Sequence, residues 1–362
     1  MEDKPSLVEI KTPTTRIAWV DTARVFAIFC VVLCHAVETV YQFDIDFISR
    51  LTMKSRVFMF VCFTISRLGV PFFLFITGFL LLDRIYTPEQ SMIFWKKNWI
   101  RLLITVEIWT VLYALFLWIY KEQPFNWINV VKQLTFIKSV PLSHMWYIPM
   151  IIGMYIFIPL VANMLHLTDA RVLIFPLVIV FILSFLYPSI NVYNKIMGHE
   201  SIKTVLSIEF SGGIYGFYLI SGYLVRKNRL KRLSTMLCLV LAIVSIGITV
   251  VIQLYSYRYG IAYNVWYDFA FLMIAALLLF EMFSRFRTIP VKNIFYLLSK
   301  YAFAVYLIHN PIIILFAPMI EKIKPLPFQL IILTVLVFTV SWMISFLLDK
   351  IPKIGKWLLY IR

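Results

Sequence analysis

Residues 17–41 form an apolar run, IAWVDTARVFAIFCVVLCHAVETVY, that is long enough to cross a bilayer yet carries an arginine and a histidine. Eleven positions separate Arg24 from His35, which in a helix is three turns plus about 20° and a rise of ~16 Å, so both side chains share one face. Asp21 and Glu38, each three positions from one of them, extend the same stripe. Because an ionised side chain facing lipid is strongly unfavourable, we predict a transmembrane helix whose polar face looks into the protein. The alternative is a purely structural set of buried polar contacts.

Composition defines the class of molecule. The chain has 62% hydrophobic and only 14% charged residues, too few polar side chains to cover a soluble globule of 362 residues. We therefore predict a polytopic membrane protein. Its net charge of +16 suits anionic lipid headgroups better than nucleic acid, because basic residues of membrane proteins gather in cytoplasmic loops. We expect membrane lipid as a partner and no nucleic acid. The four cysteines lie inside apolar runs and are interpreted as packing residues.

The apolar runs predict an all-α fold, a membrane bundle of about ten transmembrane helices. A break is indicated in the second run, where Gly69-Val70-Pro71 falls. The loops are too short for a soluble domain, so the activity must reside in the bundle. The predicted spans are 17–41, 57–82, 100–120, 146–165, 172–188, 206–225, 236–253, 265–284, 301–319 and 328–348.

The distribution of Lys and Arg predicts the orientation. With the N-terminus inside, the cytoplasmic segments hold about twice as many basic residues as the outer ones, as the positive-inside rule requires. We therefore predict that both termini are cytoplasmic. The expected organisation is a cytoplasmic tail over residues 1–16, a membrane domain over 17–349 and a cytoplasmic tail over 350–362.

This orientation sorts the polar groups within the membrane by depth. Arg24 lies in the inner part of the first helix, whereas His35 lies near its outer end. We expect Lys97, Arg101 and Glu107 on the inner side, Glu209 and Asp268 on the outer side, and Arg67 and His309 near mid-depth. A basic inner vestibule and an outer chamber of histidine and carboxylates suit a phosphate-bearing donor from the cytosol and an acceptor handled on the far side.

Five stretches of the chain combine polar and apolar residues in a distinctive order: DTARVFAIFCVVLCH (21–35), SRLGVPFFLFITGFLLL (66–82), SHMWYIPMIIGMYIFIP (143–159), FYLISGYL (217–224) and YAFAVYLIHNP (301–311). They resemble the successive signatures of acyltransferase family 3, and their order and spacing cover nearly the whole chain. The resemblance implies a multi-pass enzyme of the bacterial inner membrane that moves acyl groups, most often acetyl from acetyl-CoA, onto cell-surface or lipid-linked carbohydrate. The chain looks most similar to single-domain surface-glycan O-acetyltransferases, such as the enterobacterial common antigen type.

The resemblance assigns residues one by one. The family's essential arginine and histidine correspond to Arg24 and His35, and a later histidine corresponds to His309. The family's two arginines before the third span correspond to Asn98 and Arg101, so that Lys97 or Lys96 would have to replace the first. Its Ser-Gly-Phe at the end of the second span reads Thr77-Gly78-Phe79 here.

The chemistry of acyl transfer gives these residues roles. A base must take the proton of the acceptor hydroxyl, and imidazole does so near neutral pH, so His35 is the predicted general base. Arg24, Lys97 and Arg101 are candidates for the CoA phosphates. Arg67 could bind donor or acceptor, or it could pair with Glu107 or Glu209 and hold a broken helix. No resident cofactor and no metal site are expected.

The remaining candidates lie on the acceptor side. His309 could bind substrate or be a satisfied interior histidine. Glu209 and Asp268 could orient the acceptor or simply lie at the wet ends of their spans. Trp146 and Tyr147 could stack on sugar faces or serve as membrane-interface aromatics.

Two other functions fit the same polar stripe. An exporter or flippase-like transporter of surface polysaccharide would use it as a path and should show interrupted helices in matching halves of the chain. A scaffold for glycan assembly would leave Arg24 and His35 without a role.

Overall fold

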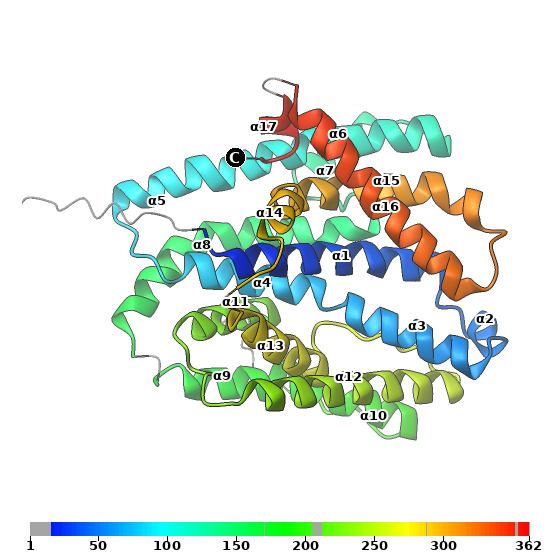
Figure 1. Cartoon of the computed structure of the whole chain (residues 1–362), viewed down its shortest axis with the longest axis horizontal. Coiled ribbons are helices and arrows are strands. Elements are labelled where there is room, and N and C mark those ends of the chain that lie inside the picture. The colour runs from blue at the N-terminus through cyan, green and yellow to red at the C-terminus, as the bar shows by residue number, and fades with distance from the viewer. Residues whose placement is uncertain are drawn as a thin grey trace, which may run out of the picture.

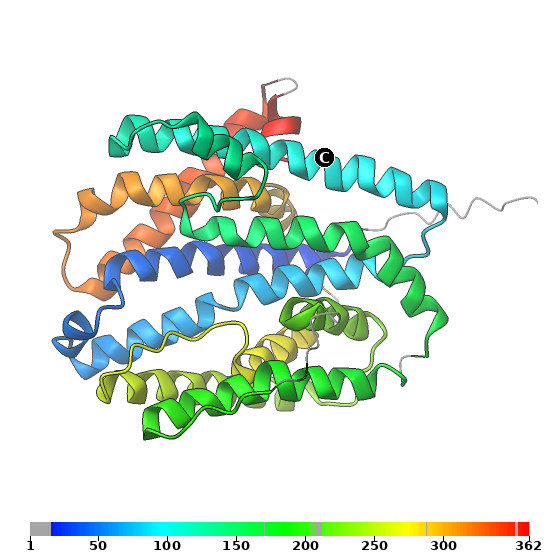
Figure 2. The ribbon, with the colours of Figure 1, turned by 180° about the vertical axis from the view of Figure 1, so that it is seen from behind.

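A computed structural model describes residues 16–169, 171–204, 206, 212–286, 288–351 and 354–361 of the chain. Within these residues it is all-helical, and its long helices run roughly side by side (Figures 1 and 2). The helices are α1 (Ala18–Tyr41), α2 (Ile45–Ser49), α3 (Met53–Ser66), α4 (Gly69–Leu81), α5 (Pro88–Phe94), α6 (Ile100–Lys121), α7 (Trp127–Leu134), α8 (Tyr147–Leu167), α9 (Ile174–Phe181), α10 (Tyr187–Met197), α11 (Gly213–Arg226), α12 (Thr235–Arg258), α13 (Ala270–Ser284), α14 (Lys292–Lys300), α15 (Ala302–Ile320), α16 (Leu326–Asp349) and α17 (Ile354–Leu358).

Eight spans in the described part of the chain are long and apolar enough to cross a membrane. They support the prediction of a multi-pass membrane protein, but the expected number of about ten is not confirmed. The predicted spans 206–225 and 265–284 correspond to the shorter helices α11 and α13. The sides of the termini stay predictions.

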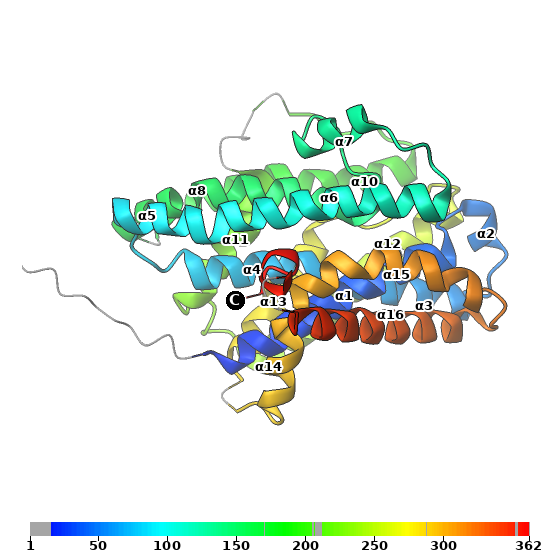
Figure 3. The same ribbon diagram turned by 90° about the horizontal axis from the view of Figure 1, so that it is seen from above.

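Helix α1 is the centre of the bundle. It packs against α3, α4, α13, α14, α15 and α16, and Figure 3 shows it enclosed among these elements. Small side chains permit this close packing, since Ala23, Ala27 and Ala36 are fully buried. The predicted first span is therefore the element on which the others are assembled.

The second predicted span is interrupted next to Gly69-Val70-Pro71, where the sequence predicted a break. α3 ends at Ser66 and α4 begins at Gly69, with Arg67 in the intervening turn. Pro71 has no N–H and so cannot satisfy the carbonyl of Arg67 as a helix would. The break is confirmed, and it fixes Arg67 at a bend inside the bundle.

The contact between α4 and α11 depends on two glycines. A Cβ on Gly78 would lie 1.8 Å from the carbonyl oxygen of Leu219, and one on Gly222 would lie 2.2 Å from that of Phe75. Only residues without a side chain allow the two backbones to approach so closely.

The expected helix over 265–284 is wrong in its first five residues. Residues 259–269 run as a non-helical segment beside α3, and α13 begins only at Ala270 (Figure 2). Such a backbone is tolerated at membrane depth only where protein groups satisfy it. Gln253 Oε1 accepts from the Val265 N–H at 3.1 Å, and the Tyr218 hydroxyl donates to the Tyr267 carbonyl at 2.9 Å.

The end of the chain is docked on α6, beside α17 (Figure 1). The Thr105 hydroxyl donates to the Trp357 carbonyl at 2.7 Å, and the Trp109 indole N–H donates to the Leu358 carbonyl at 2.7 Å. Leu359 is fully buried. The predicted tail 350–362 thus includes a packed segment.

Candidate functional site

Three histidines from distant parts of the chain meet in the interior. His35 lies on α1, His309 on α15, and His144 in the short 3₁₀ helix Ser143–Trp146 that precedes α8. Their ring centroids are 4.9 Å apart for His144 and His309, 5.3 Å for His35 and His309, and 6.1 Å for His35 and His144. The sequence predicted two of the three but missed His144, because the polar loop before it gives no periodic signal. We call these residues the histidine cluster.

His35 is connected to a partly buried ion pair between Glu38 and Arg67. Its Nδ1 lies 2.9 Å from Glu38 Oε2, and Glu38 Oε1 accepts from the Arg67 guanidinium at 3.1 Å. Because a carboxylate only accepts hydrogen bonds, Nδ1 carries the ring proton and Nε2 keeps its lone pair. The His35 side chain retains 11% of its surface exposed, and its Nδ1 contact with Glu38 fixes the orientation of the ring.

Arg67 lies at the histidine end of the site rather than with the other predicted donor-binding residues. Its guanidinium carbon is 4.6 Å from the Phe63 ring centroid and 4.7 Å from that of Trp266. The side chain is 7% exposed and pairs with Glu38, a partner that the sequence interpretation did not consider. A carboxylate and two aromatic faces thus compensate a charge that would otherwise be costly to bury.

Aromatic side chains form a wall beside this ion pair. The ring centroid of Trp146 lies 5.3 Å from that of Trp266, 5.5 Å from that of Tyr267 and 5.8 Å from that of Tyr215. Trp266 and Tyr267 belong to the non-helical segment before α13, which explains why the sequence did not predict them. Tyr147, the other predicted aromatic, packs edge-on against Trp146.

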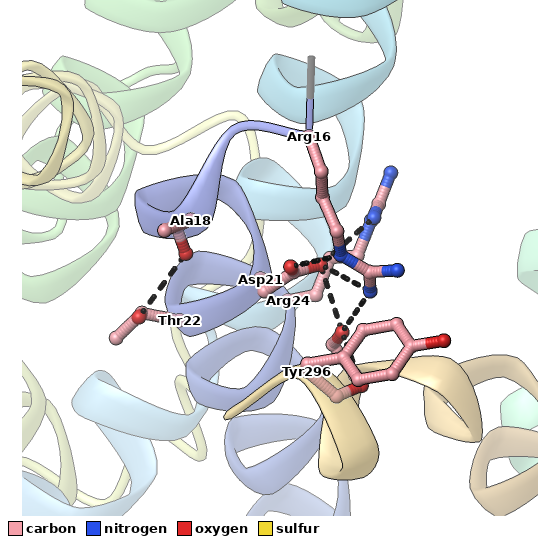
Figure 4. A network of polar contacts seen from close by, with 7 residues as sticks. Arg16, Ala18, Asp21, Thr22, Arg24 and Tyr296 are labelled. Carbon is pink, nitrogen blue, oxygen red and sulfur yellow. Dashed lines mark hydrogen bonds and ion pairs between the residues drawn. The ribbon is translucent and has the colours of Figure 1, made fainter. Parts of the chain in front are cut away.

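The N-terminal end of α1 carries a second polar network (Figure 4). Asp21 accepts from Arg16 at 2.6 Å, from Ser299 at 2.8 Å and from Arg24 at 3.4 Å. The Arg16 guanidinium also covers the Tyr296 ring at 3.6 Å. The Arg24 side chain keeps 34% of its surface exposed, so a cation remains accessible at the end of α1 opposite to His35.

The other predicted donor contacts lie on the segment leading into α6. Lys97 is exposed on a π-helical turn, Trp95–Trp99, and Asn98 donates to the Phe94 carbonyl. Arg101 donates to the Ile361 carbonyl and thus contacts the docked end of the chain. Lys97 and Arg101 thus lie on consecutive helical segments, the turn Trp95–Trp99 and α6, and Arg101 contacts the C-terminal segment.

Of the two predicted acceptor-side carboxylates, the structure describes one. Asp268 follows Tyr267 in the non-helical segment and is partly buried. Glu209 lies outside the described residues. Across the described ranges, no group of three His, Cys, Asp or Glu side chains has a geometry that could hold a metal ion.

Comparison with known families gives one match. A family model described as an acyltransferase domain matches residues 17–346, which is nearly the whole chain. No curated protein and no solved structure matches the chain.

Proposed function

The chain belongs to the acyltransferase family 3, whose domain model it matches over residues 17–346, and from this premise we propose that it transfers an acetyl or other acyl group from cytosolic acetyl-CoA to a hydroxyl of a cell-surface or lipid-linked carbohydrate. In this proposal His35 is the general base, and Arg24 holds the CoA moiety. The proposed setting is the inner membrane of a bacterium. The observation that carries the proposal is the Glu38–His35 pair on the same helix as Arg24.

The geometry at His35 suits attack by a hydroxyl. Glu38 accepts a hydrogen bond from the Nδ1–H of His35, so Nε2 can take the proton of the acceptor hydroxyl. The hydroxyl oxygen of the acceptor then attacks the thioester carbonyl. The tetrahedral intermediate then collapses by breaking the C–S bond. The sulfur leaves as the CoA thiolate and takes the proton back from His35, so that the products are an ester and CoA thiol. Glu38 stabilises the imidazolium between the two transfers.

The donor would extend along α1. A helical rise of ~16 Å separates Arg24 from His35, which is comparable with an extended pantetheine arm. Arg24 would contact the phosphates at the inner end, with Lys97 and Arg101 as further candidates. The aromatic wall of Trp146 and Trp266 offers faces on which a sugar ring can stack.

Labelled acetyl transfer tests the proposal. Membranes containing the protein are given radiolabelled acetyl-CoA, and label is followed into the host's surface glycan. We expect His35→Ala to lose transfer with normal membrane insertion. His166→Ala is the matched control, because His166 lies on α8 outside the histidine cluster and should leave transfer intact. Full activity of His35→Ala would refute the assigned base.

A transporter is the second candidate, and one observation favours it. Two segments of the bundle are interrupted, at Arg67 between α3 and α4 and at residues 259–269 before α13, as in transporters with broken helices. The melting temperature of the purified protein discriminates the two functions. A donor that binds the folded state must raise it, so we expect acetyl-CoA to raise it and Arg24→Met to abolish the shift.

A further inference from the structure

Two buried ring nitrogens in the histidine cluster have no hydrogen-bond partner. They are His309 Nε2 and His144 Nδ1, on side chains that are 0% and 1% exposed. Buried polar atoms in proteins are nearly always paired, and an unpaired one is destabilising. Two such atoms on rings 4.9 Å apart indicate a place where a ligand or water completes the hydrogen bonding.

The partners of His309 fix its tautomer. Nδ1 lies 2.7 Å from the Tyr306 carbonyl oxygen, which can only accept, so Nδ1 carries the proton. Nε2 therefore presents a lone pair.

His144 gives the same result by another route. The Tyr113 hydroxyl donates to the Leu307 carbonyl at 2.5 Å, so its oxygen is left to accept from His144 Nε2 at 3.3 Å. Nδ1 of His144 is then the atom with a lone pair. Together with Nε2 of His35, the cluster has three ring nitrogens with lone pairs, and each ring carries its proton on the other nitrogen.

We propose that the histidine cluster is a subsite for a neutral ligand with two adjacent hydroxyl groups. His35 Nε2 would accept from the reacting hydroxyl and His309 Nε2 from its neighbour, with His144 Nδ1 as a third acceptor. The ring centroids of His35 and His309 are 5.3 Å apart, so the two rings are close enough to act on adjacent hydroxyls of one ligand. As an acceptor subsite this inference rests on the proposed function, and it selects sugars with a free hydroxyl next to the acylated one.

The chemistry of the cluster disfavours an anionic ligand, because an anion could only accept hydrogen bonds and the three ring nitrogens offer lone pairs. A neutral polyol supplies donors without charge, and the aromatic ring of Tyr306 lies beside His144, with centroids 5.3 Å apart.

Nitrogen NMR of the detergent-solubilised, histidine-labelled protein tests the subsite directly, with trans-1,2-cyclohexanediol as the probe and cyclohexanol as the single-hydroxyl control. We expect the diol to move the unprotonated nitrogens of His309 and His144 upfield and cyclohexanol to leave His309 unchanged. His309→Leu should abolish the diol-dependent shift of the remaining cluster nitrogen, His144 Nδ1. His309→Gln, whose amide oxygen restores an acceptor, should recover part of it, and His166→Leu should leave it intact.

Transfer assays separate this inference from the proposed function. The wild type should acetylate the diol with about fivefold higher kcat/KM than cyclohexanol, the factor that one net hydrogen bond supplies, and His309→Leu should remove that preference. A diol-dependent NMR shift without transfer would keep the subsite and refute acyl transfer. Equal transfer to both alcohols, or no shift with the diol, would overturn the subsite, whether the cluster then holds water or nothing.

Discussion

Replacing Glu38 by Gln tests the link between the ion pair and the proposed chemistry. Glu38 is the shared partner of two groups, at 2.9 Å from His35 Nδ1 and 3.1 Å from the Arg67 guanidinium. A glutamine is nearly isosteric, but its amide can donate to Nδ1. The ring would then carry its proton on Nε2, which could no longer accept one from the acceptor hydroxyl.

The magnitude follows from the bonds lost. A hydrogen bond to a charged group contributes about 1.5–3 kcal/mol, and its loss from the imidazolium-like transition state predicts about 10- to 100-fold lower kcat. The change also leaves Arg67 buried without its carboxylate, which destabilises a fold by about 3 kcal/mol. We therefore expect both slower transfer and a lower melting temperature, with little change in KM for acetyl-CoA.

A second substitution separates the two effects. In Glu38→Gln/Arg67→Met the unpaired cation is gone, so the melting temperature should recover towards that of the wild type. Transfer should stay slow, because the amide lacks the negative charge that stabilises the imidazolium of His35 in the transition state. The assays are labelled acetyl transfer under saturating donor and thermal unfolding in detergent. Wild-type kcat in Glu38→Gln, or kcat that recovers together with stability in the double variant, would refute the reasoning.

Three further predictions follow from packing and charge outside the site. Gly78→Val should prevent stable folding, because its Cβ would lie 1.8 Å from a backbone oxygen of α11. The measurement is the yield of monodisperse protein. Gly247→Val is the control and should fold, because no atom lies within 4 Å of the added Cβ. Burial alone would raise the pKa of Asp83, but hydrogen bonds from Lys227 and a neighbouring arginine hold that pKa below its ordinary value. The ionised Asp83 therefore stabilises the fold fully above its pKa in the unfolded chain, about 3.9, and this stabilisation is lost as the pH falls through its lower pKa in the folded protein. In Asp83→Asn we expect stability to fall less steeply at acidic pH. Trp109→Phe removes a hydrogen bond to the docked C-terminal segment and should raise protease cleavage there about fivefold, whereas unchanged cleavage would contradict its role.

The part of this fold that local sequence determines was predictable. Hydropathy predicted a membrane protein, and the spacing of Arg24 and His35 predicted that their side chains lie on the same face of α1. Pro71 predicted the break before α4, because a residue without an N–H cannot complete the hydrogen bonds of its own helix. These are effects within a few residues of their cause.

The part that depends on distant partners was not predictable in this way. An apolar stretch before α13 reads as helix, yet it is extended because Gln253 and Tyr218, from other helices, satisfy its backbone. Arg67 forms an ion pair with Glu38, which lies 29 positions earlier in the sequence. His144 joins the cluster only because tyrosine hydroxyls hold it from α6 and α15. No periodicity in the chain records such contacts.

The pattern of paired and unpaired groups points to function more strongly than the presence of polar residues alone. Inside a membrane every polar group needs a partner, and the bundle supplies one even for the irregular backbone at Val265 and Tyr267. His309 Nε2 and His144 Nδ1 are buried to the same degree but lack one. Other buried side-chain atoms of the described residues, such as Arg67 Nε and Trp342 Nε1, also lack a partner, but the two histidine nitrogens lie on neighbouring rings, where a leucine or phenylalanine would fill the space without an unpaired nitrogen. A ligand that supplies the missing donors gives these two histidines a physical reason to be there.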